Sequence, residues 1–172
     1  DRVYVITDRE TQAIGDALKE ETLEVGAACR LVRLEDFGPR PMLDLASDLL
    51  EDFLNFKPTV SFYAAASQEG EVKMRMKFQQ KVRSECAARD IPQPRHGHMV
   101  SITPQLIREG MTANYQEINR ITFKILDLVK NARVIQVSSL KGTEITARFN
   151  PGYHWVPCHG LYHTAGDWGN LP

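Results

Sequence analysis

The chain has 172 residues, a formal net charge of −1 at pH 7, 42% hydrophobic residues and 25% charged residues. This length suits one domain, or one domain with an additional arm, and it allows a buried core. The near-neutral charge excludes a strong overall attraction to nucleic acid or anionic lipid, and no apolar run reaches the roughly 18 residues of a membrane span. We therefore expect a globular protein whose partners include neither a membrane nor a nucleic acid.

Three cysteines, Cys29, Cys86 and Cys158, are widely spaced along the chain. An odd number at such spacings does not make a disulfide framework, and no signal peptide opens the sequence. A reducing, cytoplasmic location is the expected setting. Because no initiator Met precedes the first predicted strand and Pro172 falls in a predicted loop, we also expect the chain to be part of a longer protein.

Strand-like and helix-like segments alternate through the first hundred residues. Apolar and β-branched residues predict strands over Arg2–Thr7, Cys29–Leu34, Val60–Ala65 and His96–Ile102. Between the strands, helical spacing predicts a first helix that is capped by Thr7 and Glu10 and ends at Gly26. Further helices are predicted over Leu45–Phe56, over Glu71–Ala88 and, as a short helix, from Thr103-Pro104 to Ile107. A proline-containing loop is predicted over Phe37–Met42. This alternation favours a parallel sheet with right-handed crossovers.

The clearest helical pattern follows Asn114, an expected N-cap with Glu117 three residues further on. Its apolar stripe contains Ile118, Ile121, Ile125, Leu128 and Val129. Strands are expected next over Arg133–Ser139 and Thr143–Phe149, antiparallel because a tight Lys141-Gly142 turn joins them. We expect the chain to be organised around this helix and strand pair.

The predicted fold class is therefore α/β, a Rossmann-like layered domain with a mostly parallel sheet and a C-terminal antiparallel strand pair. The predicted organisation is an α/β domain over residues 1–150 and a loop or strap over residues 151–172. A nucleotide cofactor is not expected, because the turn after the first strand, Thr7 to Thr11, lacks the glycines of a dinucleotide fingerprint and contains two acids.

Basic residues gather in the third predicted helix, at Lys73, Arg75, Lys77, Lys81 and Arg83. One interpretation is an anion or nucleic-acid surface, which would make the chain a non-catalytic binding module using the basic helix 73–83. The interpretation we favour is a solvated outer face over a Met-rich core, because the net charge is near zero and aromatic stacking residues are missing.

Histidine and cysteine side chains gather near the C-terminus, at His154, Cys158, His159 and His163. Such residues bind zinc, and His96 with His98 would project from one face of a strand to join them. The spacing matches no standard zinc module, so we favour a loop that lines a cleft or an interface. No Gly-x-Ser-x-Gly motif is present and Cys86 is expected to be buried, so no catalytic residue is predicted.

Two stretches resemble a known family when taken together. The first runs from Ile107 to Ile118 and continues through the long helix to Lys141-Gly142-Thr143-Glu144-Ile145-Thr146, and the second is Gly166-Asp167-Trp168-Gly169-Asn170-Leu171-Pro172. In this order and spacing they resemble the N-terminal domain of the aminopeptidase T-like family, also described as leucyl aminopeptidase-like or thermophilic metalloaminopeptidases. The 2,5-dihydroxypyridine dioxygenases are similar relatives. The segment between Ser67 and Arg95 departs from this likeness.

The resemblance implies a metal-dependent hydrolase that releases N-terminal residues from peptides. Two divalent metals (Zn, Co or Mn) would be held by a C-terminal domain, whose first ligand is the glutamate of a Gly-Glu that follows the Asn-Leu-Pro run. No metal ligand therefore falls on this sequence, and residues 1–172 alone are expected to be inactive. Asp167, Trp168 and Asn170 would line the substrate cleft. The implied partners are the C-terminal domain and, as an open option, a second copy in a homodimer. The alternative is a dioxygenase that binds one non-haem iron in the same missing part.

Overall fold

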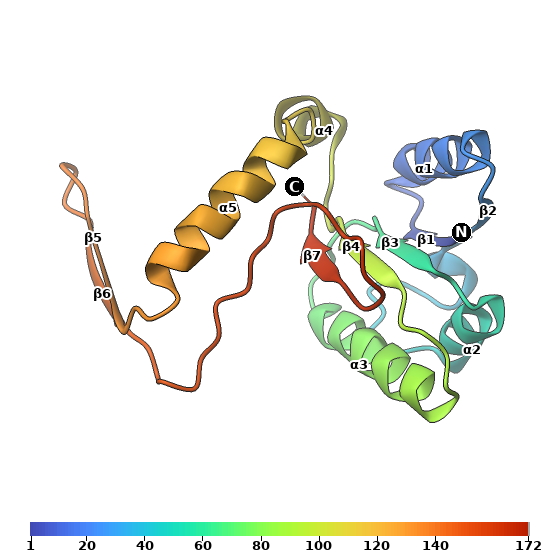
Figure 1. The fold of residues 1–172 in the computed structure, drawn as a ribbon. Coiled ribbons are helices and arrows are strands. Elements are labelled where there is room, and N and C mark those ends of the chain that lie inside the picture. Colours follow the sequence, from blue (N-terminus) through green and yellow to red (C-terminus); the bar gives the residue numbers. More distant parts are fainter. Residues whose placement is uncertain (172) are drawn as a thin grey trace. The chain divides into compact units, whose positions relative to one another are not determined.

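A five-stranded parallel sheet forms the centre of the first of two units in a computed structural model that describes residues 1–171 (Figure 1). The strand order is β2-β1-β3-β4-β7. The strands are β1 (Arg2–Thr7), β2 (Ala28–Arg33), β3 (Val60–Tyr63), β4 (Arg95–His98) and β7 (Trp168–Asn170). This confirms the predicted fold class, an α/β chain with a mostly parallel sheet and a separate antiparallel strand pair.

Helices cover both faces of this sheet. Four α-helices belong to the first unit: α1 (Gln12–Glu24), α2 (Ser47–Phe56), α3 (Val72–Ala88) and α4 (Pro104–Gly110). Ile14 of α1 belongs to an apolar cluster with Ala64 and Met99, against which Ile107 of α4 also packs. The helices α2 and α3 pack on the opposite face, where their apolar residues join those of β1 and β3. Among the described helices, none combines the length and apolar character that crossing a membrane requires.

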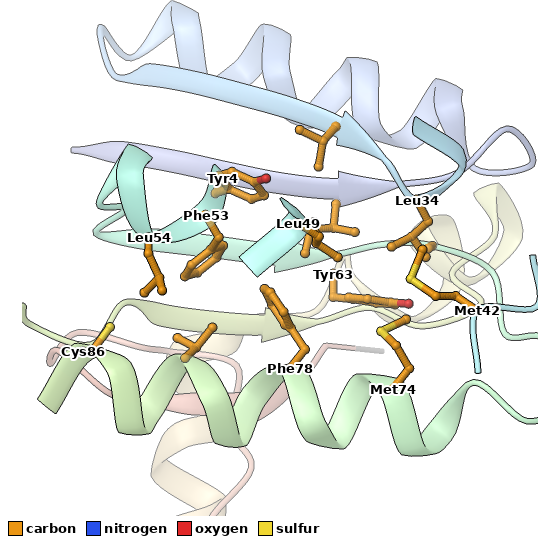
Figure 2. Packing of buried hydrophobic residues seen from close by; sticks show 14 residues of the cluster. Tyr4, Leu34, Met42, Leu49, Phe53, Leu54, Tyr63, Met74, Phe78 and Cys86 are labelled. Carbon is orange, nitrogen blue, oxygen red and sulfur yellow. The ribbon is translucent and has the colours of Figure 1, made fainter. Parts of the chain in front are cut away.

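The larger core lies between the sheet and the pair α2 and α3 (Figure 2). Strand residues alternate between faces, so Tyr4 and Ile6 point into this core while Val3 and Val5 point away from it. The Phe53 ring lies edge-to-face against Tyr4 and against Phe78, with ring centroids 4.9 and 5.2 Å apart. Such edge-to-face contacts add to the free energy gained from burying the rings.

The sequence predicted the existence of these elements better than their ends. The helix cap expected at Thr7 and Glu10 is wrong, because α1 begins at Gln12, after Thr11. The side chain of Asp8 instead accepts hydrogen bonds from the backbone and hydroxyl of Thr11, at 2.8 Å each. The fourth strand stops at His98 rather than Ile102. The expected cap at Thr103 is confirmed, since its hydroxyl accepts from the Leu106 amide at 3.2 Å.

The first unit is also discontinuous in sequence. It comprises Asp1–Ala113 together with the segment from Tyr162 onward, and Asn114–Leu161 forms the second unit. The boundary expected at residue 150 stays a prediction. Within the segment expected to be a loop or strap, Trp168–Asn170 forms β7 and pairs in parallel with β4, His96 opposite Trp168 and His98 opposite Asn170.

The second unit contains α5 (Tyr115–Val129) and the antiparallel pair β5 (Val134–Ser138) and β6 (Glu144–Arg148). Asn114 caps α5 as expected, since its side chain accepts from the Gln116 and Glu117 amides, whereas the Glu117 side chain pairs with Arg120. The expected turn is also present, with Gly142 at φ +91°. We expected the chain to be organised around α5, but none of its fifteen residues, all of them described, is buried, and the two apolar clusters lie in the first unit.

Two buried tyrosines make a matched test of this packing. The Tyr4 hydroxyl donates to Asp52 at 2.6 Å, whereas the Tyr63 hydroxyl is buried without a hydrogen-bond partner among the described residues. We expect Tyr4→Phe to lower the free energy of unfolding by about 1–2 kcal/mol, because it removes a bond to a charged acceptor. Tyr63→Phe should leave it unchanged or raise it by up to about 1 kcal/mol, because it removes an unsatisfied group.

Urea unfolding of the two variants beside the parent chain measures both effects. A larger loss of stability in Tyr63→Phe than in Tyr4→Phe would show that the Tyr63 hydroxyl has a partner that stabilises the fold.

Candidate functional site

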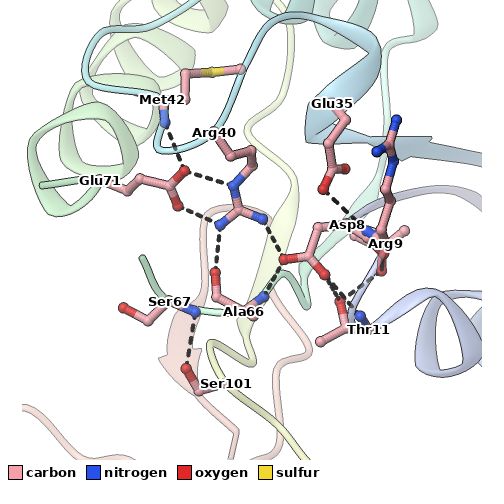
Figure 3. A network of polar contacts seen from close by, with 11 residues as sticks. Asp8, Arg9, Thr11, Glu35, Arg40, Met42, Ala66, Ser67, Glu71 and Ser101 are labelled. Atoms are coloured by element: carbon pink, nitrogen blue, oxygen red, sulfur yellow. Dashed lines mark hydrogen bonds and ion pairs between the residues drawn. The ribbon is translucent and has the colours of Figure 1, made fainter. Parts of the chain in front are cut away.

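The strand order creates one crevice where a ligand is usually found in α/β sheets. The connections from β1 and β3 leave the sheet toward opposite faces, which opens a crevice at the carboxyl ends of these two strands. Here a side chain of the same protein fills that position, because Arg40 lies between the buried carboxylates of Asp8 and Glu71 (Figure 3). The Arg40 and Glu71 side chains are 4% and 0% exposed.

Every strong hydrogen-bonding group of this cluster has a partner. Arg40 donates to Glu71 Oε1 at 2.6 Å, to the Ala66 carbonyl at 2.7 Å, and to Asp8. Asp8 also accepts from the Ala66 amide at 2.7 Å, and Glu71 accepts from the Met42 amide at 2.8 Å. Sequence reasoning predicted no such role for Glu71 and placed it as the first residue of a charged helix. A cluster satisfied this completely is structural and leaves no group free for a ligand.

Burial and hydrogen bonding act in opposite directions on these carboxylates. Burial raises the pKa of Asp8, but the bonds from Thr11, Arg40 and Ala66 lower it more, so the net shift is downward. Burial likewise raises the pKa of Glu71, and Arg40 with the Met42 amide more than reverses that effect. Burial lowers the pKa of Arg40, and the two carboxylates raise it above its ordinary value. All three groups therefore stay charged at neutral pH.

A separate cleft of about 480 Å³ lies in the first unit along α3 and the strands β4 and β7. Its polar and charged lining comes from Arg75, Gln79, Gln80, Arg83, His98 and Asn170, and its apolar lining from Val72, Met76 and Trp168. His98 and Asn170 stand opposite each other at the carboxyl ends of their strands, and α3 begins at that same edge of the sheet. The cleft therefore starts where α/β domains commonly bind ligands and extends along the helix.

His98 lines the base of the cleft, and the buried His96 beside it is held in one arrangement. The Nδ1 atom of buried His96 lies 2.8 Å from Ser61 Oγ, and its Nε2 atom lies 2.9 Å from Gln79 Nε2. Because an amide nitrogen only donates, His96 Nε2 accepts this bond and His96 Nδ1 donates to Ser61. The His98 Nδ1 atom lies 3.3 Å from the same Nε2. This geometry requires a neutral His96 ring.

Aromatic contacts complete the base of the cleft. The His98 ring stacks on Tyr63 with centroids 5.4 Å apart, and the Trp168 indole lies 5.8 Å from His98 and 6.5 Å from His96. Burial, together with the nearby His98, lowers the pKa of His96 to about 3. Burial also lowers the pKa of His98 to about 4, with the Arg75 guanidinium as the second cause. Both rings are therefore neutral at pH 7.

The histidines considered as zinc ligands do not form a cluster with one another in the part of the chain that the structure describes. No group of three or more His, Cys, Asp or Glu side chains placed to hold a metal occurs among residues 1–171. His154 is exposed, whereas His159 accepts from Asn119 at 3.0 Å and its ring lies against Phe123. The backbone of His163 donates to Asp167 at 2.9 Å. His96 and His98 share one face of β4, as the spacing predicted.

The residues expected to line a cleft separate into two roles. Trp168 and Asn170 line the cleft beside α3, and that this cleft binds a peptide stays a prediction. Asp167 lines a smaller pocket and also closes its own loop, because its carboxylate accepts from the amides of His163 and Thr164 while its carbonyl accepts from the His96 amide.

The basic residues of α3 divide in a similar way. Lys73, Lys77 and Lys81 are exposed, and Lys77 pairs with Asp44 at 2.6 Å. Arg75 and Arg83 line the cleft. The Met-rich core expected under the helix holds for Met74, which is buried, but not for Met76, which is 60% exposed and lines the cleft. Cys86 is buried as expected, and burial raises the pKa of its thiol.

Sequence reasoning missed Gln79, Gln80 and the pairing of Ser61 with His96. No pattern marked them, because neutral amide and hydroxyl residues are common on helix surfaces and in strands. Only the i, i+4 spacing of Arg75, Gln79 and Arg83 on one helical face could have indicated that they meet in one place.

Comparisons of the chain with known protein families, with curated proteins and with solved structures found no match. The site is therefore defined by its own geometry, as a positively charged cleft with an aromatic wall and the neutral His98 ring at its base.

The buried arginine gives the first prediction from this site. Arg40→Met removes the cation and leaves two carboxylates buried, so we expect the free energy of unfolding at pH 7 to fall by about 3–5 kcal/mol. The matched control, Arg33→Met, breaks an exposed pair with Asp36 and should leave stability close to that of the parent chain. Urea unfolding at fixed pH measures both.

The same variant has a distinct pH dependence. In the parent chain the lowered pKa values of Asp8 and Glu71 mean that their stabilisation is present above about pH 4 and is lost on further acidification. In Arg40→Met the carboxylates keep their burial without the guanidinium, so their pKa values should rise. The deficit relative to the parent should therefore shrink between pH 7 and pH 5. An equal deficit at both pH values would contradict this account.

The second prediction concerns His98. Its pKa of about 4 lies below the ordinary value of about 6.5, so its ring should remain neutral at pH 5 in an NMR titration. Because the unfolded chain binds this proton more tightly, the histidine should reduce stability progressively as the pH falls from about 6.5 toward 4. Arg75→Met should raise the pKa of His98, and the exposed Lys77→Met should not. Titration of His98 near 6.5 in the folded parent chain would refute the burial argument.

Proposed function

We propose that the chain is the N-terminal α/β domain of a metal-dependent aminopeptidase-like hydrolase that releases N-terminal residues from peptides. In this proposal its role is to form one wall of the substrate cleft, and the divalent metal ions (Zn, Co or Mn) are bound by a C-terminal domain that follows it. The proposal rests on the likeness of residues 107–146 and 166–172 to that family.

The observation that best supports it is the position of Gly166–Leu171. This stretch carries part of the resemblance, and its residues Trp168–Asn170 form β7, parallel to β4. The Leu171 amide also donates to the His98 carbonyl at 2.9 Å. The chain therefore reaches the carboxyl edge of the sheet at Leu171, the edge at which α/β domains contribute to their active sites. A following domain that begins there would meet the cleft-lining side chains of Trp168 and Asn170.

The chemistry of such an enzyme defines what each part has to supply. When bound by the C-terminal domain, two metal ions would supply an activated water and stabilisation of the negative charge on the peptide carbonyl. A wall that lacks metal ligands can contribute by orienting the substrate and by excluding bulk water. The tryptophan and amide side chains of the first unit suit that task, because they offer an apolar surface and hydrogen-bonding groups without a competing carboxylate.

The test is an assay of the whole gene product that contains this chain. With Zn, Co or Mn added, it should hydrolyse peptides with a free N-terminus and leave the same peptides with an acetylated N-terminus intact. Residues 1–172 alone should show no turnover and should retain no stoichiometric metal after dialysis. Iron-dependent oxygen consumption with 2,5-dihydroxypyridine, without peptide hydrolysis, would favour the dioxygenase instead. Turnover or tight zinc binding by residues 1–172 alone would refute the proposal.

A further inference from the structure

The cleft beside α3 is lined by two positively charged side chains. Arg75 and Arg83 both line it, and none of its lining residues is acidic. Neither arginine forms an ion pair with any residue in the described part of the chain, whereas Lys77 of the same helix pairs with Asp44. The nearest buried carboxylate in sequence, Glu71, is engaged by Arg40. Arg75 also lies over the Tyr63 ring, 6.0 Å from its centroid, and its charge acts on Glu71. An anionic group that enters this cleft therefore meets two guanidinium groups without breaking an ion pair of the described chain.

One wall of the same cleft is apolar and partly exposed. Trp168 is 42% exposed, and Val72 and Met76 across the cleft are 53% and 60% exposed. The indole lies against the rings of His96 and His98. An aromatic side chain with an accessible surface beside two cations is suited to a ligand that has both a flat apolar part and a negative charge.

The size and length of the cleft limit the ligand further. Arg75 and Arg83 are eight positions apart in α3, which places their backbones about 12 Å apart along the helix axis. The volume of about 480 Å³ lies in the range of small-molecule sites, which is roughly 300–1,000 Å³. The amides of Gln80 and Asn170 add hydrogen-bonding groups along its length. This space fits a ring of one or two cycles with an anionic substituent, and it is too small for a folded partner.

We propose that the cleft between α3 and β7 binds a small aromatic anion, whose ring packs against Trp168 and whose carboxylate or phosphate is bound by Arg75 and Arg83. This site requires only residues of the first unit. It does not depend on the proposed peptidase activity, and it can be tested with the 172-residue chain and without metal.

The binding test uses the fluorescence of Trp168. The second tryptophan, Trp155, lies in the other unit, so Trp155→Phe leaves Trp168 as the single reporter. We expect a saturable change in its emission with benzoate, with phenyl phosphate, or with both, and the comparison tells a carboxylate site from a phosphate site. Benzamide, a neutral molecule of similar shape, and inorganic phosphate, which has no ring, should each bind at least about tenfold more weakly than the preferred anion.

Matched variants in the same background locate the site. Arg75→Met and Arg83→Met should each weaken binding of the preferred anion at least about tenfold, because each removes a charge-assisted contact. Lys81→Met removes one positive charge from an exposed position of the same helix and should leave the affinity unchanged. Trp168→Leu, measured by calorimetry, should weaken binding of the aromatic anion and bring it close to that of inorganic phosphate. Urea midpoints show that each variant is folded.

Three results would overturn the proposal. These are the lack of saturable binding by either aromatic anion, equal binding of benzamide, and a loss in Lys81→Met as large as that in the arginine variants. The last result would mean that the anions respond to the overall charge of α3 rather than to the cleft. The NMR signal of His98 gives an independent readout, because an anion bound beside it should raise the pKa of that ring.

Discussion

The buried guanidinium of Arg40 is the interaction on which the rest of the first unit depends. It joins the end of β1, through Asp8, to the end of β3, through Ala66, and to the start of α3, through Glu71. These segments surround the crevice that the strand order opens at the carboxyl edge of the sheet. Burying each carboxylate costs free energy, and the same cation compensates both of them. Removing any one of the three charges therefore leaves a buried charge uncompensated and lowers the free energy of unfolding.

This internal ion cluster also decides where a ligand can bind. In many α/β sheets the crevice at the switch in strand order is the binding site, but here the chain has filled it. The open space is displaced along the sheet to the far side of β4, where β7 adds an edge and α3 provides two arginines that form no ion pair within residues 1–171. The position of α3 is fixed in turn by Glu71, the residue before its first turn, so the structural cluster and the cleft share one helix.

The sequence was informative wherever burial imposes a regular pattern. The strands β1 and β3 are short apolar runs because both of their faces are covered. Asn114 and Thr103 cap helices because their side chains accept hydrogen bonds from backbone amides that have no partner within the helix. The same reasoning could not identify Asp8, Arg40 and Glu71 as partners, because they are 32 and 31 residues apart and each resembles an ordinary surface charge. It also missed β7, whose three residues contain no apolar run.

The expected central role of α5 failed for a different physical reason. The apolar stripe is real, but Ile121, Ile125 and Leu128 remain 43–79% exposed, so amphipathicity here does not report burial within the described chain. A stripe predicts that a helix has a face to cover and does not identify what covers it. The candidate site was predictable only in part, since the spacing of His96 and His98 placed them on one face, whereas Gln79 and Arg75 reach them through tertiary packing.

The pairing of β7 has a consequence for the dynamics of this molecule. Residues 99–167 separate it from its neighbour β4, so docking this edge strand closes a long loop with only three paired residues. Local unfolding of this edge strand is expected to cost less free energy than unfolding of β1 inside the sheet, so the backbone amides of β7 should exchange hydrogen with solvent faster than those of β1. Each detachment would carry Trp168 and Asn170 away with the strand and dismantle one side of the cleft. A ligand bound in the cleft would therefore hold β7 against β4. Its binding should slow the hydrogen exchange of the β7 backbone amides.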